Sequence, residues 1–498
     1  MEQPVLGITL LIICSTVCYL SWHQFRNGRY FTAIALLTGC GILLRLFVSA
    51  EFFLHAWDER YHALVAKNLI QHPLLPTLYD NPDLPHDYRE WSASHVWLHK
   101  QPLPLWAMAW SMFLFGVNEM ALRLPSVLLT TIGIGLTYQI GYLLFSRKVG
   151  FIAAFLYTIH GLILEATGGR VTTDHIDVFF LFWVELAVFF AIKFAFEKRQ
   201  GFNVLCGLSI GAAILSKWLP ALVMLPIWLL LVHGSRKYTL QETGRHFGIL
   251  CATVILVVLP WQWYIYHTFP IEAHWENSFN WRHITEVLEG HSGPFYYHFD
   301  RMRIVYGELI YVPVAWFFWK TFKSGRHYKR WAPAIWVLFP FLFFSFVKTK
   351  MQGYTLFTAP ALFIITAVFW QYLYTYRHRF KYKIPVWLTL FLLIALPVRY
   401  TLERLNPFQP IAGRPAWVAE LKRLEAAHQN RPVVLFNVDY PVEAMFYADL
   451  TAYSGIPDAD LANRLIGKGY AVLVNDKGDL DGKLNGINGV EIIKLTNH

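Results

Sequence analysis

Two adjacent carboxylates, Asp58 and Glu59, come soon after an apolar run of membrane-spanning length at residues 31–50. Burying ionised groups near a bilayer is costly, so acids at such a boundary usually serve a function. The residues 58–70, DERYHALVAKNLI, have helical spacing, and a helix N-terminus favours ionised carboxylates. An ionised carboxylate beside a reacting group can act as a general base. The alternative is that Asp58 and Glu59 are ordinary acids at a helix start.

Two further positions could contribute charge to the same chemistry. Lys100 precedes a Gln-Pro-Leu-Pro segment and could bind a phosphate as a point charge, although a lysine at a membrane edge also extends toward water without any ligand. Asp174 stands at the predicted exported end of a hydrophobic helix, and Asp177 follows one turn later. Asp58 and Asp174 together would form a catalytic or cation-binding group, whereas Asp177 could instead bind a neighbouring helix.

The elements that must position these residues are membrane helices. The chain has 498 residues, of which 55% are hydrophobic and only 15% charged, against about 25% charged in soluble domains. Apolar runs recur along the whole chain, and runs of this kind cross bilayers as helices. We count twelve: 5–22, 31–50, 121–145, 149–165, 176–195, 203–216, 219–233, 246–265, 304–320, 333–347, 355–373 and 384–400. The sequence therefore predicts an all-α polytopic membrane protein with about 12 transmembrane helices, and an interfacial helix at 104–117.

The basic residues predict which loops lie on the cytoplasmic side of the membrane and which lie on the exported side. Lys and Arg collect in short loops, for example at Arg147 and Lys148, at Arg236 and Lys237, and at Lys320. Such loops are cytoplasmic in membrane proteins. The net charge of +10 is then mainly a topology signal, and no nucleic-acid partner is expected. We predict a multi-pass protein of the cell (inner) membrane, with the active site and the C-terminal domain on the periplasmic, exported face.

The C-terminal residues 401–498 differ in kind from the rest. Residues 414–428 and 458–468 have helical patterns, while 432–438 and 470–474 read as buried strands. This predicts an exported, soluble α/β domain, with no phosphate-loop or metal motif. Its simplest role is a lid or packing module.

The predicted organisation has three parts. Residues 1–30 form an extra N-terminal span with a cytoplasmic turn. Residues 31–400 form a transmembrane catalytic domain with exported loops at 51–120 and 266–303, and residues 401–498 form the α/β domain.

Seven segments in order resemble those of the GT-C glycosyltransferases, in particular the group of protein O-mannosyltransferases and aminoarabinose transferases (glycosyltransferase family 39 and its relatives). The segments are LRLFVSAEFFLHAWDERYHALVAKNL (44–69), HKQPLPLW (99–106), FGVNEMALRLPSVLL (115–129), TTDHIDVFF (172–180), LSKWLPALV (215–223), GHSGPFYYH (290–298) and KTKMQGYTLFTAPAL (348–362). The resemblance covers roughly residues 31–375. The chain departs from it at the first span, at the inserted Gln101 and at Trp218.

The resemblance implies an activity and a set of roles. Family members transfer a sugar from a polyprenyl-phosphate carrier to an acceptor on the exported side. Asp58 matches the acid that deprotonates the acceptor, with Glu59 beside it as a further catalytic candidate, and Asp174 matches a second site acid. The positions that match groups holding the carrier phosphate are Lys100, Arg282, His291, Lys350 and Tyr354.

Several points stay open at the level of sequence. The acceptor could be a Ser or Thr of an exported protein, lipid A or another glycolipid, and the sugar is not specified. The protein would also contact membrane lipids. No metal ligand set is predicted, although Asp58 and Asp174 could share a divalent metal. The alternative functions are a transporter or flippase for a lipid-linked or anionic substrate, and a membrane scaffold.

Overall fold

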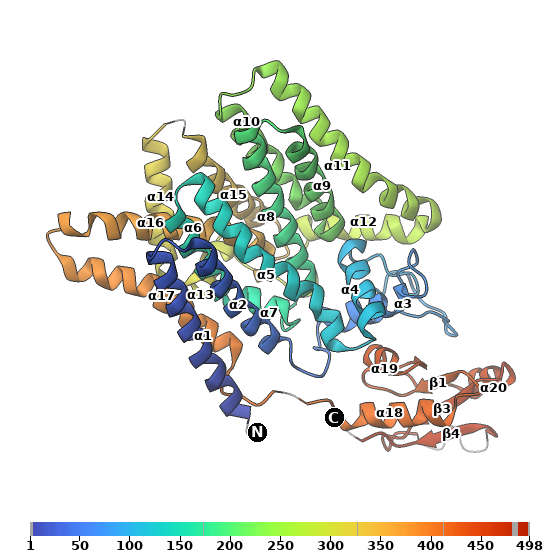
Figure 1. The fold of residues 1–498 in the computed structure, drawn as a ribbon. Coiled ribbons are helices and arrows are strands. Elements are labelled where there is room, and N and C mark those ends of the chain that lie inside the picture. Colours follow the sequence, from blue (N-terminus) through green and yellow to red (C-terminus); the bar gives the residue numbers. More distant parts are fainter. Residues whose placement is uncertain (1–2, 173, 326, 412, 481–486, 497–498) are drawn as a thin grey trace. The chain divides into compact units, whose positions relative to one another are not determined.

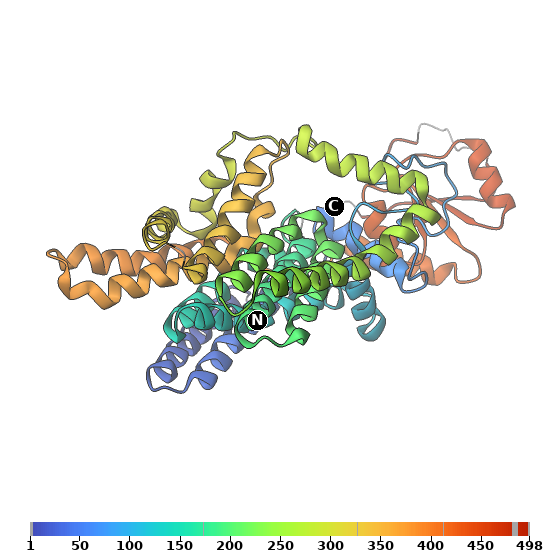
Figure 2. The same cartoon turned by 90° about the horizontal axis from the view of Figure 1, so that it is seen from above.

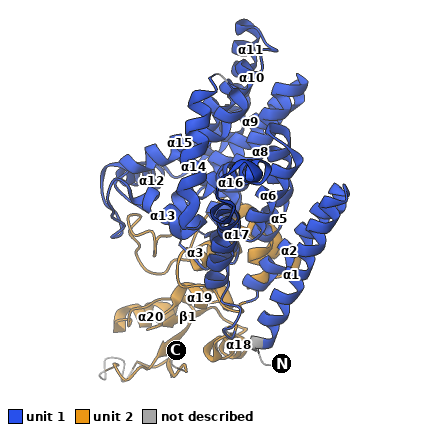
Figure 3. Ribbon diagram, turned by 90° about the vertical axis from the view of Figure 1, so that its left-hand side faces the viewer, with its two compact units in different colours: residues 1–50, 100–104, 125–410 blue, residues 51–99, 105–124, 411–498 orange. Residues whose placement is uncertain are grey.

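The computed structural model describes residues 3–172, 174–325, 327–411, 413–480 and 487–496. The chain is mostly helical, with a small sheet near its C-terminus (Figure 1). It divides into two compact units, shown in blue and orange in Figure 3. Unit 1 comprises residues 1–50, 100–104 and 125–410, and unit 2 comprises residues 51–99, 105–124 and 411–498. Each unit is described by itself below.

Unit 1 contains the candidate membrane spans together with shorter helices. Their bounds are α1 Gln3–Arg26, α2 Tyr30–Val48, α5 Glu119–Leu144 (from Pro125 onward), α6 Arg147–Thr158, α7 Gly161–Thr167, α8 Asp174–Glu197, α9 Gln200–Lys217, η1 Leu219–Val223, α10 Met224–Gly234, α11 Leu240–Thr268, α12 Pro270–Thr285, α13 Tyr297–Tyr306, η2 Glu308–Ile310, α14 Tyr311–Lys323, α15 Tyr328–Phe346, η3 Gln352–Thr358, α16 Ala359–Tyr376, η4 Arg377–Arg379 and α17 Lys383–Leu405. Helices α16 and α17 form a hairpin that both views show clearly (Figure 1, Figure 2).

The predicted fold class is confirmed, whereas the predicted count of about twelve spans is not. Seven helical segments among the described residues are long and apolar enough to cross a membrane, and the bent pair α6–α7 would make an eighth. The predicted spans 203–216 and 333–347 fall on the continuous helices α9 and α15, which are not among these seven, whereas the predicted spans 219–233 and 304–320 are interrupted. Trp218 has a positive φ of 71° and separates α9 from η1, and Gly307, with φ 94°, ends α13 before η2.

The share of each span that is buried inside the protein distinguishes central spans from peripheral ones. In α8, 72% of the apolar window is buried inside the protein, and in the η3–α16 segment 78%, whereas in α1 only 22% is buried. Side chains on α8 therefore face other helices over most of its surface. Acids placed there, such as Asp174 and Asp177, are enclosed by protein.

Unit 2 combines the first predicted exported loop with the C-terminal domain. Its elements are α3 Asp58–Leu69, most of α4 Pro102–Phe115, the first turn of α5, α18 Ala416–Ala427, β1 Val433–Phe436, α19 Pro441–Tyr447, β2 Thr451–Ala452, α20 Ala459–Gly467, β3 Ala471–Asn475 and β4 Val490–Ile493. The four strands are parallel, in the order β2-β1-β3-β4. The two strands and two helices expected in the C-terminal domain are present, while β2, β4 and α19 had no clear sequence signal.

The domain boundaries differ from those expected. Helix α17 continues to Leu405 and ends at Asn406, which adopts the left-handed conformation (φ 48°), so a boundary at residue 401 would cut a helix. Residues 51–99 and 105–124 group with the C-terminal domain rather than with the membrane helices. The α/β domain is thus one part of a larger compact unit that also holds Asp58.

Candidate active site

The N-terminus of α3 presents the two acids that the sequence singled out. Asp58 is the first residue of the helix and is half-buried, whereas Glu59 is fully buried. The preceding residue, Trp57, makes no side-chain cap to the helix. Because the first turn of a helix favours negative charge, this position supports an ionised Asp58.

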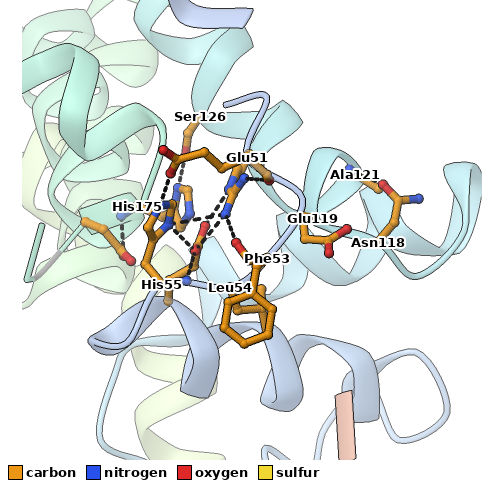
Figure 4. A network of polar contacts seen from close by, with 12 residues as sticks. Glu51, Phe53, Leu54, His55, Asn118, Glu119, Ala121, Ser126 and His175 are labelled. Atoms are coloured by element: carbon orange, nitrogen blue, oxygen red, sulfur yellow. Dashed lines mark hydrogen bonds and ion pairs between the residues drawn. The ribbon is translucent and has the colours of Figure 1, made fainter. Parts of the chain in front are cut away.

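Glu59 is held by a charged network whose labelled members appear in Figure 4. Arg123 donates two hydrogen bonds to its carboxylate, Nε to Oε1 at 2.6 Å and Nη2 to Oε2 at 2.9 Å. The same guanidinium donates to the backbone carbonyls of Glu51 and Phe53. His55 donates its backbone N–H to Glu59 at 2.7 Å, and its ring contacts both Glu59 and Glu51. Glu59 therefore fixes the loop that leads into α3.

The network sets the charge of His55. Burial lowers the pKa of its ring, but the carboxylates of Glu59 and Glu51 outweigh that effect and raise the pKa to about 9. His55 is thus a cation at neutral pH, lying between two carboxylates. Arg123 belongs to the Arg-Leu-Pro motif, so the network explains what that motif does in this chain.

The C-terminal domain is tied to the same loop within unit 2. Tyr447 donates its hydroxyl to Glu119 at 2.9 Å and accepts the backbone N–H of Leu54 at 3.1 Å. Arg60, which directly follows Glu59 in α3, forms an ion pair with the buried Glu443 at 3.0 Å. Burial raises the pKa of Glu443, and Arg60 opposes that rise. The domain therefore packs on and steadies the helix that carries Asp58.

In unit 1, the acids of α8 have different surroundings. Asp174 is fully buried, and one of its oxygens accepts the backbone N–H of His175. The His175 ring in turn lies 2.8 Å from the hydroxyl of Ser126 (Figure 4). Asp177 forms an ion pair with Lys217, the last residue of α9. The pairing places a cation directly beside the second acid of α8.

Lys217 also faces an aromatic group. Its ammonium lies 5.0 Å from the ring centre of Tyr354, which is half-buried at the start of η3. The Tyr354 ring stacks on His298, with centroids 6.5 Å apart. His298 is 2% exposed, and neither ring nitrogen has a hydrogen-bond partner among the described residues. Burial and the neighbouring Lys350 lower the pKa of His298 to about 4, so its ring is neutral at physiological pH.

Three of the predicted phosphate-binding residues, Arg282, His291 and Lys350, lie on two adjoining segments of unit 1. Backbone hydrogen bonds join His283 to Thr349 and Lys350 to His291. Lys350 is buried, and its ammonium donates to the carbonyls of Phe344 (3.0 Å) and Ser345 (2.7 Å). It thus satisfies the otherwise unpaired carbonyls at the end of α15.

Arg282 and Lys100 complete the set. Arg282, in the last turn of α12, is paired with Glu286 at 2.9 Å and is 39% exposed. Lys100 is half-buried just before α4, and the neighbouring Gln101 accepts a hydrogen bond from Gln262 of α11. The inserted Gln101 therefore makes an interhelical contact. The roles predicted for all these residues stay predictions.

Sequence reasoning missed four residues that organise these surroundings: His55, Arg123, Lys217 and His298. Lys217 had a usable signal, because a lysine ending an apolar helix within a family-like motif rarely lacks a charged partner. The partners of Arg123 could not be read from the sequence, because they lie 64 and 68 positions away.

No group of three or more His, Cys, Asp or Glu side chains within the described part of the chain is arranged to hold a metal ion. A metal shared by Asp58 and Asp174 stays an untested prediction.

Comparison with known proteins identifies the fold. The family described as dolichyl-phosphate-mannose-protein mannosyltransferase matches residues 99–264, which include Lys100, Asp174, Asp177 and Lys217. The structure of ArnT from Cupriavidus metallidurans bound to undecaprenyl phosphate aligns with a TM-score of 0.62 at 17% identity, over 87% of this chain and 90% of that one. The archaeal oligosaccharyltransferase AglB from Archaeoglobus fulgidus aligns with a TM-score of 0.57 at 12% identity, over 86% and 65%. The fold is that of the GT-C membrane glycosyltransferases, as the motifs predicted.

Within that class, the chain is similar to aminoarabinose transferases. The undecaprenyl phosphate-alpha-4-amino-4-deoxy-L-arabinose arabinosyl transferase of Pseudomonas aeruginosa is 25% identical over 287 residues, which is 53% of this chain and 49% of that protein. The chain thus spans about half the length of the curated relatives it matches.

Proposed function

We propose that this protein is a membrane glycosyltransferase that moves a sugar from a polyprenyl-phosphate carrier to an exported acceptor. The observation that carries the proposal is the fold, which aligns over most of its length with a protein solved with undecaprenyl phosphate bound. The cationic and aromatic group formed by Lys217 and Tyr354 supports it, because a lipid phosphate needs such partners. The transporter alternative is not favoured, because the named relatives are transferases.

Asp58 is the proposed general base. It would take the proton of the acceptor hydroxyl, whose oxygen then attacks the anomeric carbon of the sugar. The bond from that carbon to the phosphate oxygen breaks, and the polyprenyl phosphate leaves with the bonding electron pair. The Glu59–Arg123 network would act on this step only by holding the start of α3 in place.

Lys217 is the proposed principal cation for the departing phosphate. The phosphate becomes more negative as it leaves, so a fixed ammonium beside it lowers the barrier. Asp177 would keep Lys217 ionised and oriented, and in this proposal Asp177 takes the role of second site acid that the motif match gave to Asp174. Lys350 is assigned a positioning role, since its ammonium already binds the carbonyls that end α15.

The proposal is tested with the purified full-length protein, a panel of polyprenyl-phosphate sugars and a membrane extract as acceptor. Transfer of a labelled sugar is measured for the wild type and for Asp58→Asn. Removing a general base reduces turnover by about 10²- to 10⁴-fold. Asp87→Asn serves as a matched control, because Asp87 lies in the same loop and is exposed. Near-normal turnover in Asp58→Asn would refute its role as base, and no transfer from any donor by the wild type would refute the function.

The exported location of Asp58 is a further part of the proposal. It is supported by the basic residues of the short loops, such as Arg236 and Lys237. A phosphatase fused after Gln409 should be active outside the membrane, and one fused at Arg236 should be inactive. The opposite pattern would refute this orientation.

A further inference from the structure

A cavity of about 320 Å³ lies within unit 2, and neither Asp58 nor Glu59 lines it. Three cations line it: Lys67 of α3, Lys422 of α18, and Arg414, which precedes α18. Two acids, Glu425 and Asp449, line it as well. The volume is near the lower end of small-molecule pockets, about 300–1,000 Å³. It is therefore suited to a compact polar group.

Two of the cations are fixed by the protein. Lys67 donates to the backbone carbonyls of Met445 at 2.6 Å and Ala448 at 3.2 Å. Arg414 pairs with Glu119 at 2.8 Å and lies over the Tyr447 ring. These contacts build the wall of the cavity.

The other charges of the cavity are presented to solvent. Lys422 and Asp449 are both exposed, and Glu425 accepts the backbone N–H of Asp449 at 3.2 Å. When Glu119 is counted with the lining residues, three positive charges are matched by three negative ones. A purely anionic ligand would meet Glu425 and Asp449 with repulsion, whereas a ligand carrying one charge of each sign would satisfy both sets.

An apolar surface adjoins the cavity. Val117 lines it and follows the end of α4, where Phe113, Leu114 and Phe115 are 63%, 54% and 62% exposed. Trp110, one turn earlier, is 64% exposed. Aromatic and aliphatic side chains exposed together on one helix end are typical of segments that lie in a membrane interface.

We propose that this cavity binds the headgroup of a zwitterionic aminophospholipid of the phosphoethanolamine type, whose acyl chains lie along the exposed end of α4. Lys422 and Arg414 would hold the phosphate, and Asp449 and Glu425 would accept hydrogen bonds from the primary ammonium. A quaternary ammonium has no N–H to donate, so a phosphocholine headgroup would bind less well. Such a site would tether unit 2 to the bilayer, and it does not depend on the proposed transferase activity.

The test uses the full-length protein, delipidated in detergent, and lipids with identical acyl chains but phosphoethanolamine, phosphocholine or phosphoglycerol headgroups. Native mass spectrometry counts bound lipid and gives apparent affinities. The phosphoethanolamine lipid should bind most tightly. Lys422→Ala and Asp449→Asn should each weaken it by about tenfold, because each removes one charge-assisted contact. Arg423→Ala is the matched control, since Arg423 is the exposed neighbour of Lys422 on α18 and does not line the cavity.

The outcomes separate the alternatives. Equal binding of the three lipids would overturn the proposal, and so would tighter binding of the phosphoglycerol lipid, which would indicate a simple anion site. Unchanged binding in both cavity variants would also overturn it, because the lipid would then bind elsewhere. Thermal unfolding of each variant shows that a loss of binding is not a loss of fold. Glycerophosphoethanolamine, which lacks acyl chains, should bind more weakly than the lipid if the end of α4 contributes.

Discussion

The Glu59–Arg123 pair of unit 2 and the Asp177–Lys217 pair of unit 1 differ in how completely the surrounding protein satisfies their hydrogen-bonding groups. In unit 2, the side chains of Glu59 and Arg123 are both 0% exposed, and the carboxylate has partners on both oxygens. In unit 1, Asp177 and Lys217 are 5% and 18% exposed, and Lys217 faces the ring of Tyr354. A saturated, buried ion pair holds structure in place, whereas a cation beside a half-buried aromatic ring can still bind a ligand. A charged side chain by itself therefore does not mark a ligand site.

The largest expected effect is a loss of stability when the Glu59–Arg123 pair is broken. Arg123→Met should destabilise the protein by about 3–5 kcal/mol, because it removes the guanidinium that binds both oxygens of the buried Glu59 carboxylate and leaves only His55 beside it. Thermal unfolding in detergent would show a clear fall in Tm. The double variant Glu59→Gln/Arg123→Met should recover part of the loss, since the stranded charge is gone. A Tm equal to that of the wild type in the single variant would contradict the structural role of this network.

Lys217→Ala should act mainly on activity. Under the proposed function it raises the apparent KM for the lipid-linked donor and lowers kcat, by about tenfold to a hundredfold together, since a charge-assisted contact contributes about 1.5–3 kcal/mol. Its Tm should fall less than that of Arg123→Met, because Lys217 is partly exposed. Arg399→Ala is a matched control, as Arg399 is an exposed cation with an i,i+4 partner. If Lys217→Ala kept wild-type donor kinetics, the phosphate would have to bind elsewhere.

The charge of His55 gives a dependence of stability on pH. Its pKa is raised from 6.5 to about 9 in the folded protein, so the protonated ring stabilises the fold. That contribution is complete below pH 6.5 and is lost as pH rises through 9, with an upper bound of roughly 3 kcal/mol. The Tm of the wild type should therefore fall between pH 7 and 10 more than that of His55→Gln. Parallel curves for the two proteins would show that His55 is not a buried cation.

The smallest expected effect concerns His298, whose ring stacks on Tyr354 beside the Asp177–Lys217 pair. Its two buried ring nitrogens lack partners among the described residues, and replacing an unsatisfied polar group by an apolar one of similar shape is neutral or stabilising. His298→Phe should thus raise stability by up to about 1 kcal/mol, read as a small rise in Tm. Since the pKa of His298 is lowered from 6.5 to about 4 in the folded protein, the wild type loses stability as pH falls through 6.5, so the advantage of His298→Phe should widen from pH 8 to pH 6. A lower Tm in His298→Phe would mean that the ring nitrogens are satisfied in the working protein.

The sequence by itself determined the fold class and the resemblance to the GT-C glycosyltransferases. Apolar runs and basic loops report directly on the bilayer, because each span must satisfy its own backbone within about 20 residues. The strands β1 and β3 were also readable, since each is a short, continuous apolar run that the sheet buries. The span count was not determined, because breaks such as those at Trp218 and Gly307 depend on backbone conformation rather than on hydropathy.

Only the tertiary structure decided which charges are paired. The sequence left open whether Asp177 binds a neighbouring helix, and in the structure its partner is Lys217 of α9, 40 residues away. Lys350 matched a phosphate-binding position, but its ammonium binds the carbonyls at the end of α15. The grouping of the first exported loop with the C-terminal domain likewise rests on contacts such as Arg60–Glu443, 383 positions apart. A local pattern records hydropathy and helix spacing, whereas the partner of a charge is set by which distant segments pack together.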